Sequence, residues 1–216
     1  MRKMLLLSAV VLLASAAQAF AASSICDATP GNLVLNCGFE GGTYSSTIGG
    51  FTNNSVPVDW VPNMGFDLEP SFNHVNSGNQ HSGNFDLSIG NFDNQPLAML
   101  SQTIATVSGD TYSGSFWAFD GGANGDPNAF LNLVVDGNVE VSLNDTVGAW
   151  SQFTFSFTGT GSDTLTIEAQ TNPSEWYADD VVVTGASPVP EPSTFALLSG
   201  AGLVILAGMA HRKLFA

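Results

Sequence analysis

Residues 131–141 read Leu-Asn-Leu-Val-Val-Asp-Gly-Asn-Val-Glu-Val, and this stretch decides the fold class. Asp136-Gly137 is a favourable two-residue hairpin turn, because both central residues of such a turn take positive φ and Asp-Gly tolerates that backbone. The runs on either side are rich in valine, which favours strands. The stretch therefore predicts two antiparallel strands joined by a tight turn.

Strand patterns continue outward from this hairpin. Phe153, Phe155 and Phe157 alternate with Thr and Ser, and Leu165 and Ile167 alternate with Thr. Period-two alternation is typical of strands that have one buried and one polar face. Strands are also expected at residues 33–37, 56–61, 85–89, 98–107, 111–119 and 177–184. Nine or ten strands at this spacing, without an amphipathic helix of useful length, predict one all-β sandwich over residues 20–185.

Residues 1–19 have the form of a secretory signal peptide. A basic start is followed by an apolar run from Met4 to Ala16, and Ala17 and Ala19 form a small-x-small cleavage site. This combination is typical of an exported protein. We expect signal peptidase to cut after Ala19, with Ala21 or Ala22 as alternatives.

The chain ends on three parts in a fixed order. A proline-rich stretch at 186–194 precedes an apolar run at 195–210 and a basic tail at 211–216. Residues 193–210 carry no charge and would span roughly 27 Å as a helix, which is just enough for a hydrocarbon core. The positive-inside rule places the basic tail in the cytoplasm and the preceding domain outside.

Within these parts, the informative residues are Val189, Pro190, Glu191, Pro192, Arg212 and Lys213. Together with the short apolar run they resemble the PEP-CTERM sorting signal of Gram-negative bacteria. The resemblance implies processing by an exosortase, a membrane-embedded cysteine transpeptidase. It also implies a transient inner-membrane anchor and then a place at the cell surface or in the matrix of bacteria that make exopolysaccharide and biofilms. The alternative is an ordinary C-terminal anchor with a proline-rich stalk.

The region between the two ends is strongly acidic. It contains every Asp and Glu except Glu191, and residues 4–211 include no Lys or Arg. This composition excludes a phosphate-binding surface, so we expect neither nucleic acid nor anionic lipid as a partner. The region has no cationic side chain to stabilise an oxyanion or a phosphate, and no G-x-S-x-G or H-E-x-x-H motif, so we do not expect an enzyme.

Cys26 and Cys37 are the two cysteines of the chain. Both lie in the part expected to be exported, where disulfides persist. We expect them to pair and to tie the mature N-terminus to the first strand. The alternative is two unpaired thiols near a frayed end.

Three short motifs follow one another along the acidic region. Residues 32–40 read Asn-Leu-Val-Leu-Asn-Cys-Gly-Phe-Glu, residues 109–117 read Gly-Asp-Thr-Tyr-Ser-Gly-Ser-Phe-Trp, and residues 176–181 read Trp-Tyr-Ala-Asp-Asp-Val. Their order resembles the galactose-binding-like jelly roll of carbohydrate-binding modules. The resemblance implies a jelly roll that binds polysaccharide. It also implies a structural calcium held by Glu40 with Asp179 or Asp180, and calcium prefers such hard oxygens. The alternative is that the two aspartates are solvated or hydrogen-bonded strand ends.

Sugar binding also needs an aromatic ring that faces solvent. Trp117 is the candidate, because it shares a strand face with Ser113 and Ser115; the alternative is core packing. His74 and His81 lie in a stretch rich in Gly, Asn and Ser, and we expect them to be exposed bystanders. The sequence thus predicts an exported surface or matrix protein that binds carbohydrate, and the alternative is a structural matrix protein without a specific ligand.

Overall fold

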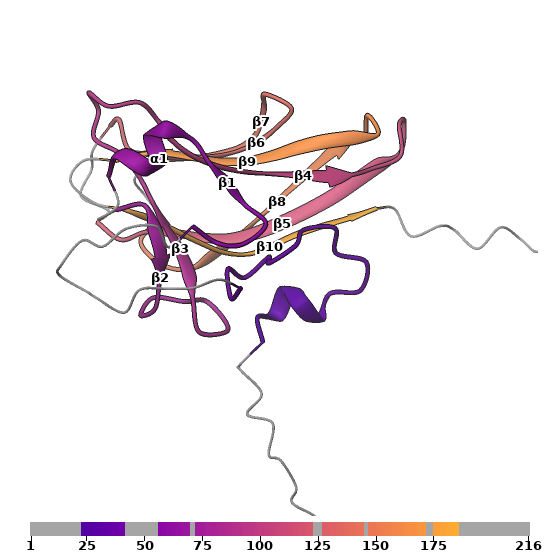
Figure 1. The fold of residues 1–216 in the computed structure, drawn as a ribbon, viewed down its shortest axis with the longest axis horizontal. Coiled ribbons are helices and arrows are strands. Elements are labelled where there is room, and N and C mark those ends of the chain that lie inside the picture. The colour runs from indigo at the N-terminus through magenta and orange to yellow at the C-terminus, as the bar shows by residue number, and fades with distance from the viewer. Residues whose placement is uncertain are drawn as a thin grey trace, which may run out of the picture.

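The computed structural model describes residues 23–41, 56–69, 72–122, 127–144, 147–171 and 175–185. In this part of the chain, ten strands form two antiparallel five-stranded sheets that pack face to face (Figure 1). The expected all-β sandwich is confirmed. The expected signal peptide at 1–19, including Ala17 and Ala19, lies outside the described residues. So do the expected proline-rich linker, apolar helix and basic tail at 186–216.

The two sheets are called sheet A and sheet B, and each has five strands. Sheet A has the order β1 (Val61–Pro62), β4 (Ala98–Ala105), β9 (Ser162–Gln170), β6 (Phe130–Val135), β7 (Asn138–Asn144). Sheet B has the order β2 (His74–Asn76), β3 (Asp86–Ile89), β10 (Trp176–Gly185), β5 (Thr111–Asp120), β8 (Ser151–Thr158). From β3 onward the chain crosses repeatedly from one sheet to the other, which is consistent with a jelly roll.

The core lies between the sheets and follows the alternation of the strands. On β9, Leu165 and Ile167 are fully buried, whereas Thr164 and Thr166 between them are only half-buried. On β5, Phe116 points into the core and Trp117 points to the outer face. This period-two pattern leaves each sheet with a polar outer face on which a binding site can be built.

The hairpin expected at residues 131–141 is confirmed. Strands β6 and β7 pair antiparallel, and Val135 lies opposite Asn138. The two residues between them both have positive φ, 49° at Asp136 and 79° at Gly137. These angles are those of the tight turn that Asp-Gly favours.

The strand expected at residues 33–37 does not form. This segment lies beside β10, where the Leu33 amide donates to the Val183 carbonyl at 2.8 Å. The next contact, however, is made by a side chain, because the Val183 amide donates to Oδ1 of Asn32 at 2.9 Å. Asn36 and Phe39 have φ of 47° and 59°, so the backbone turns away instead of continuing a ladder.

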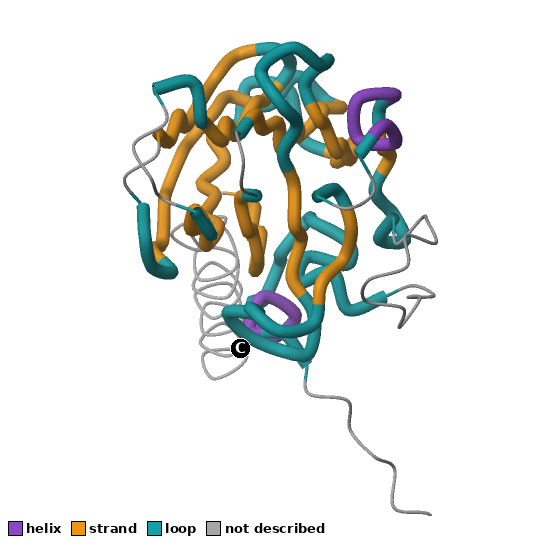
Figure 2. Tube along the Cα trace, turned by 90° about the vertical axis from the view of Figure 1, so that its left-hand side faces the viewer, coloured by secondary structure: helices purple, strands orange, loops and turns teal. Residues whose placement is uncertain are grey.

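Other short elements also differ from the sequence expectation. Of the strand expected at residues 56–61, only Val61 lies in a strand, as the first residue of β1. Asp59 has a φ of 70°, so the chain turns just before β1 begins. A short strand, β2, and two one-turn helices, η1 (Ile25–Ala28) and α1 (Met64–Leu68), were not expected. Figures 1 and 2 show both helices at the periphery of the sandwich.

The N-terminal segment is fastened by a disulfide between Cys26 and Cys37, with Cα atoms 6.1 Å apart. This is the pairing that the sequence favours. Both half-cystines are buried, and the Val181 amide on β10 donates to the Cys37 carbonyl at 2.9 Å. Among the helices of the described ranges, none has the length and apolar character needed to cross a bilayer.

Candidate functional site

The outer face of sheet A carries mostly uncharged polar side chains. They come from three neighbouring strands, because the register sets Phe130 opposite Gln170 and Asn144, and Asn132 opposite Glu168. Threonine and serine continue the face along β9 and β4, where Thr166 pairs with Ser101 and Thr164 with Thr103. Amide and hydroxyl groups both donate and accept hydrogen bonds, so this face suits a ligand rich in hydroxyls.

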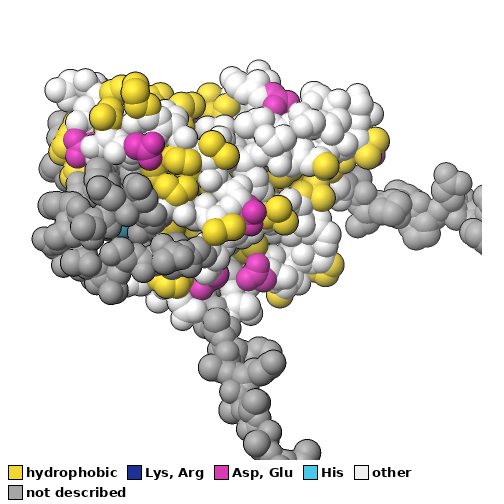
Figure 3. All heavy atoms as spheres, in the orientation of Figure 1, with side chains coloured by type: hydrophobic (Ala, Val, Ile, Leu, Met, Phe, Trp, Pro, Cys, Tyr) yellow, Lys and Arg dark blue, Asp and Glu magenta, His cyan; other side chains and the backbone are white. Residues whose placement is uncertain are grey.

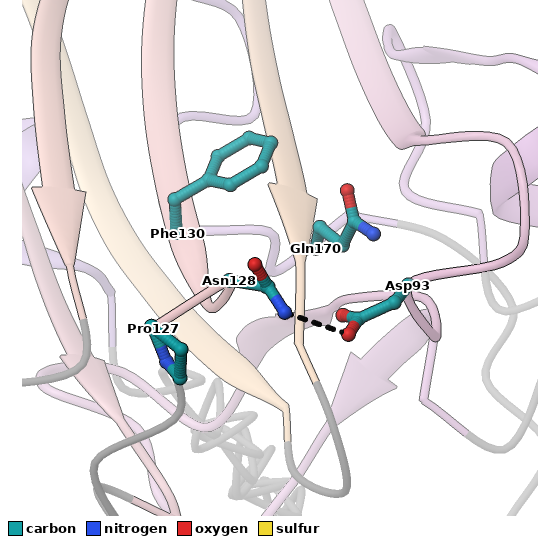
Figure 4. Close-up of a pocket in the computed structure, with 5 residues that line it drawn as sticks. All are labelled: Asp93, Pro127, Asn128, Phe130 and Gln170. Carbon is teal, nitrogen blue, oxygen red and sulfur yellow. Dashed lines mark hydrogen bonds between the residues drawn. The ribbon is translucent and has the colours of Figure 1, made fainter.

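One end of this face is hollowed around an aromatic ring. The hollow holds about 390 Å³ and is lined by Phe130, Gln170, Asp93, Asn128 and Pro127. Figure 4 shows the Phe130 ring and the Gln170 amide beside each other on adjacent strands. Across the hollow, Nδ2 of Asn128 donates to Oδ2 of Asp93 at 2.9 Å (Figure 4). The hollow is open, and Phe130 and Gln170 are half-buried.

The chemistry of the hollow combines an apolar ring face with amide and carboxylate groups. An aromatic ring offers a flat apolar surface. The amides of Gln170 and Asn128 offer two donors and an acceptor each, and the carboxylate of Asp93 accepts. Two residues further along each strand, Asn132 on β6 lies opposite Glu168 on β9. Nδ2 of Asn132 donates to Oε1 of Glu168 at 2.9 Å. A pyranose has one apolar face and a rim of hydroxyls, and this arrangement matches both.

Trp117 lies on the outer face of sheet B under the loop 77–84. The imidazole of His81 stacks on its indole, with ring centroids 3.8 Å apart and the planes 15° apart. Trp150 packs edge-on against the same imidazole and donates through Nε1 to the Asn79 carbonyl at 2.7 Å. One face of the predicted sugar-stacking ring is therefore already occupied by this chain's own histidine.

The expectation that both histidines are exposed bystanders is wrong. The His81 side chain is 19% exposed and its Nδ1 lies 2.7 Å from Oδ2 of Asp180. His74 is on β2, where burial lowers its pKa. The sequence signal was misleading because Gly, Asn and Ser near these residues build a loop that folds back onto sheet B.

Asp179 and Asp180 are consecutive residues of β10, but their carboxylates accept hydrogen bonds from different groups. Both oxygens of Asp179 are hydrogen-bonded: Oδ2 accepts from the amides of His81 and Ser82 at 3.0 and 3.1 Å, and Oδ1 accepts from the amide of Asp180 at 2.7 Å. Asp180, with a φ of 53°, accepts from the hydroxyls of Ser24 and Ser82. The two serines and His81 thus all contact the Asp180 carboxylate.

Glu40, the third residue of the expected calcium site, has a separate role. Its Oε1 accepts hydrogen bonds from the backbone amides of Asn84 and Phe85 at 2.6 and 2.9 Å. Carboxylate oxygens of Glu40, Asp179 and Asp180 do not converge within 4.8 Å of one another. A calcium ion needs several converging oxygens with free lone pairs. As arranged here, these three residues do not fit that ion.

Comparison with known proteins adds a distant likeness. No protein-family model and no curated protein matches the chain. Among solved structures, TmCBM61 in complex with β-1,4-galactotriose is 19% identical with a TM-score of 0.48, over 72% of this chain and 99% of that chain. A family 35 carbohydrate-binding module from Clostridium thermocellum is 15% identical with a TM-score of 0.42, over 59% of this chain and 93% of its own length. The CBM22-1 xylan-binding domain of Xyn10C from Paenibacillus barcinonensis is 13% identical with a TM-score of 0.41, over 62% and 91%.

The hollow around Phe130 was not anticipated from the sequence. Its two central residues lie 40 positions apart and meet only through the β6–β9 register. A signal was nevertheless present, because Phe130 and Asn132 alternate with Leu131 and Leu133. Since the leucines fill the core, alternation places the phenylalanine ring on the outer face.

Proposed function

We propose that this chain is an exported bacterial surface or matrix protein whose sandwich binds a neutral carbohydrate in the hollow around Phe130. The observation that carries the proposal is a half-buried aromatic ring set among amide groups in an open hollow of the sheet A face. The proposal rests on these residues.

The charge of the domain narrows the class of carbohydrate. Residues 4–211 include no Lys or Arg, and the hollow contains the carboxylate of Asp93. Polymers of uronic acids or sulfated sugars bring negative charge to a surface that has no cationic side chain to offset it. A neutral or amino-sugar polymer avoids this repulsion.

The size of the site sets the expected affinity. A single ring stacked on an aromatic side chain contributes about 1–3 kcal/mol by analogy with base–aromatic stacking. One ring and a few hydrogen bonds therefore give a dissociation constant of about millimolar. Such weak binding becomes useful when several copies hold one polymer, because avidity multiplies it.

The export part of the proposal is supported by the two ends of the chain. Signal peptidase would act after Ala19, and an exosortase would act near Pro190-Glu191-Pro192. The protein would cross the inner membrane, stay there briefly by its C-terminal apolar run, and then reach the cell surface or the extracellular matrix. Carbohydrate binding by the sandwich would hold it in exopolysaccharide.

Affinity electrophoresis of the full chain tests the sugar site. Gels that contain neutral β-linked galactan, xylan or glucan should slow the protein, and alginate with chelator should not. The variant F130Y keeps the ring and should still be slowed. The variant F130L keeps apolar bulk without a ring face and should migrate as in a gel without polymer.

Two further variants test whether the sugar binds at Phe130 and not elsewhere. T158A, at an exposed position of β8 in the other sheet, should leave migration unchanged. Loss of retention in W117A with F130L unaffected would place the sugar at the tryptophan instead. If no neutral or amino-sugar polymer slows the wild-type chain, the structural matrix role without a specific ligand replaces the proposal.

A further inference from the structure

Strand β8 forms one edge of sheet B, and one side of its backbone has no neighbouring strand. It pairs with β5 through all eight of its residues without a shift in register, and β5 is its single neighbour in the sheet. In the described part of the chain, no further backbone hydrogen bond reaches residues 151–158. Alternate residues of an edge strand turn their N–H and C=O groups away from the sheet. Strand β8 therefore presents a row of such groups to the outside.

The other three edges of the two sheets are short, charged or irregular. Strands β1 and β2 have two and three residues. Strand β7 carries Glu140, and its register with β6 is interrupted by a shift. Short length, charge and irregular pairing are the means by which sheet edges avoid joining one another. Strand β8 has none of them, because it is long, regular and free of charged residues and proline.

The absence of charge at this edge matters because the chain as a whole repels its own copies. Its formal net charge is −15. Residues 146–162, which include β8, nevertheless contain no Asp, Glu, Lys or Arg, and neither do residues 111–119 of the neighbouring strand β5. Two chains can therefore approach each other through this edge without bringing like charges together.

The sequence of β8 is complementary to itself about Phe155, since residues 153–157 read Phe-Thr-Phe-Ser-Phe. An antiparallel pair of β8 strands centred on Phe155 sets Phe153 of one copy opposite Phe157 of the other. It also sets Thr154 opposite Ser156. The phenylalanines face the core and the hydroxyl side chains are exposed, so each pair joins residues of the same kind on the same side of the sheet.

We propose that two copies of this chain join through β8 as a two-fold symmetric dimer, in which sheet B of one copy continues into sheet B of the other. Both halves of such an interface are the same surface, as two-fold symmetry requires. Main-chain hydrogen bonds hold the pair, as in other cases of strand addition. The contact is narrow, so we expect it to dissociate at about micromolar concentration. Each dimer would carry two hollows around Phe130, which could hold one polymer together.

Sedimentation equilibrium of the full chain from about 1 to 100 µM, at constant ionic strength, tests the dimer. The wild type should pass from monomer to dimer over this range. The variant T154D/S156D sets like charges opposite each other at both symmetric pairs, whereas T154D/S156K sets opposite charges there. The dissociation constant of the first should exceed that of the second by about tenfold or more. Both variants change the same two exposed positions and keep both apolar ends, so association through those ends does not produce this difference.

Two controls separate the dimer from general charge effects and from the sugar site. T111D/S113D adds the same charge at exposed positions of β5, one strand away from the edge, and should dimerise like the wild type. F130L changes sheet A and should also dimerise, so the sugar site and the dimer can fail independently. A wild-type chain that stays monomeric or assembles beyond a dimer, or equal dissociation constants for the two β8 variants, overturns the assignment.

Discussion

At the residue scale, Glu40 and Gly83 depend on each other. Glu40 binds the backbone amides of Asn84 and Phe85 through one oxygen. Gly83 has a φ of 68°, and a Cβ atom at this position would collide with the Glu40 carboxylate. Glycine is thus needed here for two reasons, the left-handed backbone and the close approach of the carboxylate.

The substitution G83A should therefore destabilise the domain more than an ordinary glycine replacement. Gly109 is the matched control, since its φ is 89° and a Cβ atom there meets nothing within 4 Å. Both variants bear the left-handed strain of about 1–2 kcal/mol. G83A in addition displaces Glu40 and leaves two amides without their acceptor, which costs about 1–3 kcal/mol more. Urea unfolding measures both free energies.

A double-mutant cycle shows whether this reason is correct. In an E40A background the carboxylate is absent, so the extra cost of G83A over G109A should disappear. An extra cost of the same size with and without Glu40 would mean that the loss has another origin.

At the element scale, the N-terminal segment takes the place beside β10 where β3 has ended. Strand β3 pairs with β10 only from Trp176 to Ala178. Beyond that point, the amide of Val181 donates to Cys37 and the amide of Val183 donates to the Asn32 side chain. The segment thereby supplies acceptors to a central strand that would otherwise present unpaired amides.

The disulfide should hold this segment in place. Cys26 and Cys37 are 11 positions apart, and the chain-entropy model gives about 3 kcal/mol for a loop of that length. Reduction should lower the free energy of unfolding by about this amount in a urea titration. The double variant C26S/C37S should start from the lower value and show no response to reductant. Equal transitions for reduced and oxidised wild type would show that the disulfide adds nothing to stability.

The sequence predicted the regular elements well, because long alternating strands carry their own signal. Strands β5, β8 and β9 and the β6–β7 hairpin lie where alternation and Asp-Gly place them. Residues 33–37 have a strand-like composition, but tertiary contacts through Asn32 decide their backbone. The hollow could not be assembled from the sequence, because Phe130 and Gln170 become neighbours only after β6 has paired with β9.

At the scale of the whole molecule, the acidic surface and the mostly uncharged outer face of sheet A together affect which polymers can approach. Figure 3 shows acidic side chains scattered over one face of the sandwich among polar and hydrophobic ones. The outer face of sheet A is mostly uncharged, so a neutral polymer can lie on it. We expect the acidic exterior elsewhere to repel nucleic acid and anionic polymers.

Maturation is also a property of the whole chain. The sorting-signal proposal expects the native protein to lack the segment from about Phe195 onward and to leave the inner membrane. Intact-mass measurement of protein isolated from its own cells checks this. A mature form that retains Arg212 and Lys213 would contradict exosortase processing and favour an ordinary membrane anchor.

The most direct measurement of the central claim is amide chemical-shift mapping on the isotope-labelled protein during titration with a neutral oligosaccharide. The proposal expects the largest shifts at Asp93, Asn128, Phe130 and Gln170, with saturation at about millimolar sugar. Shifts that cluster instead at His81 and Trp117, with the residues of the hollow unchanged, would contradict a sugar site around Phe130.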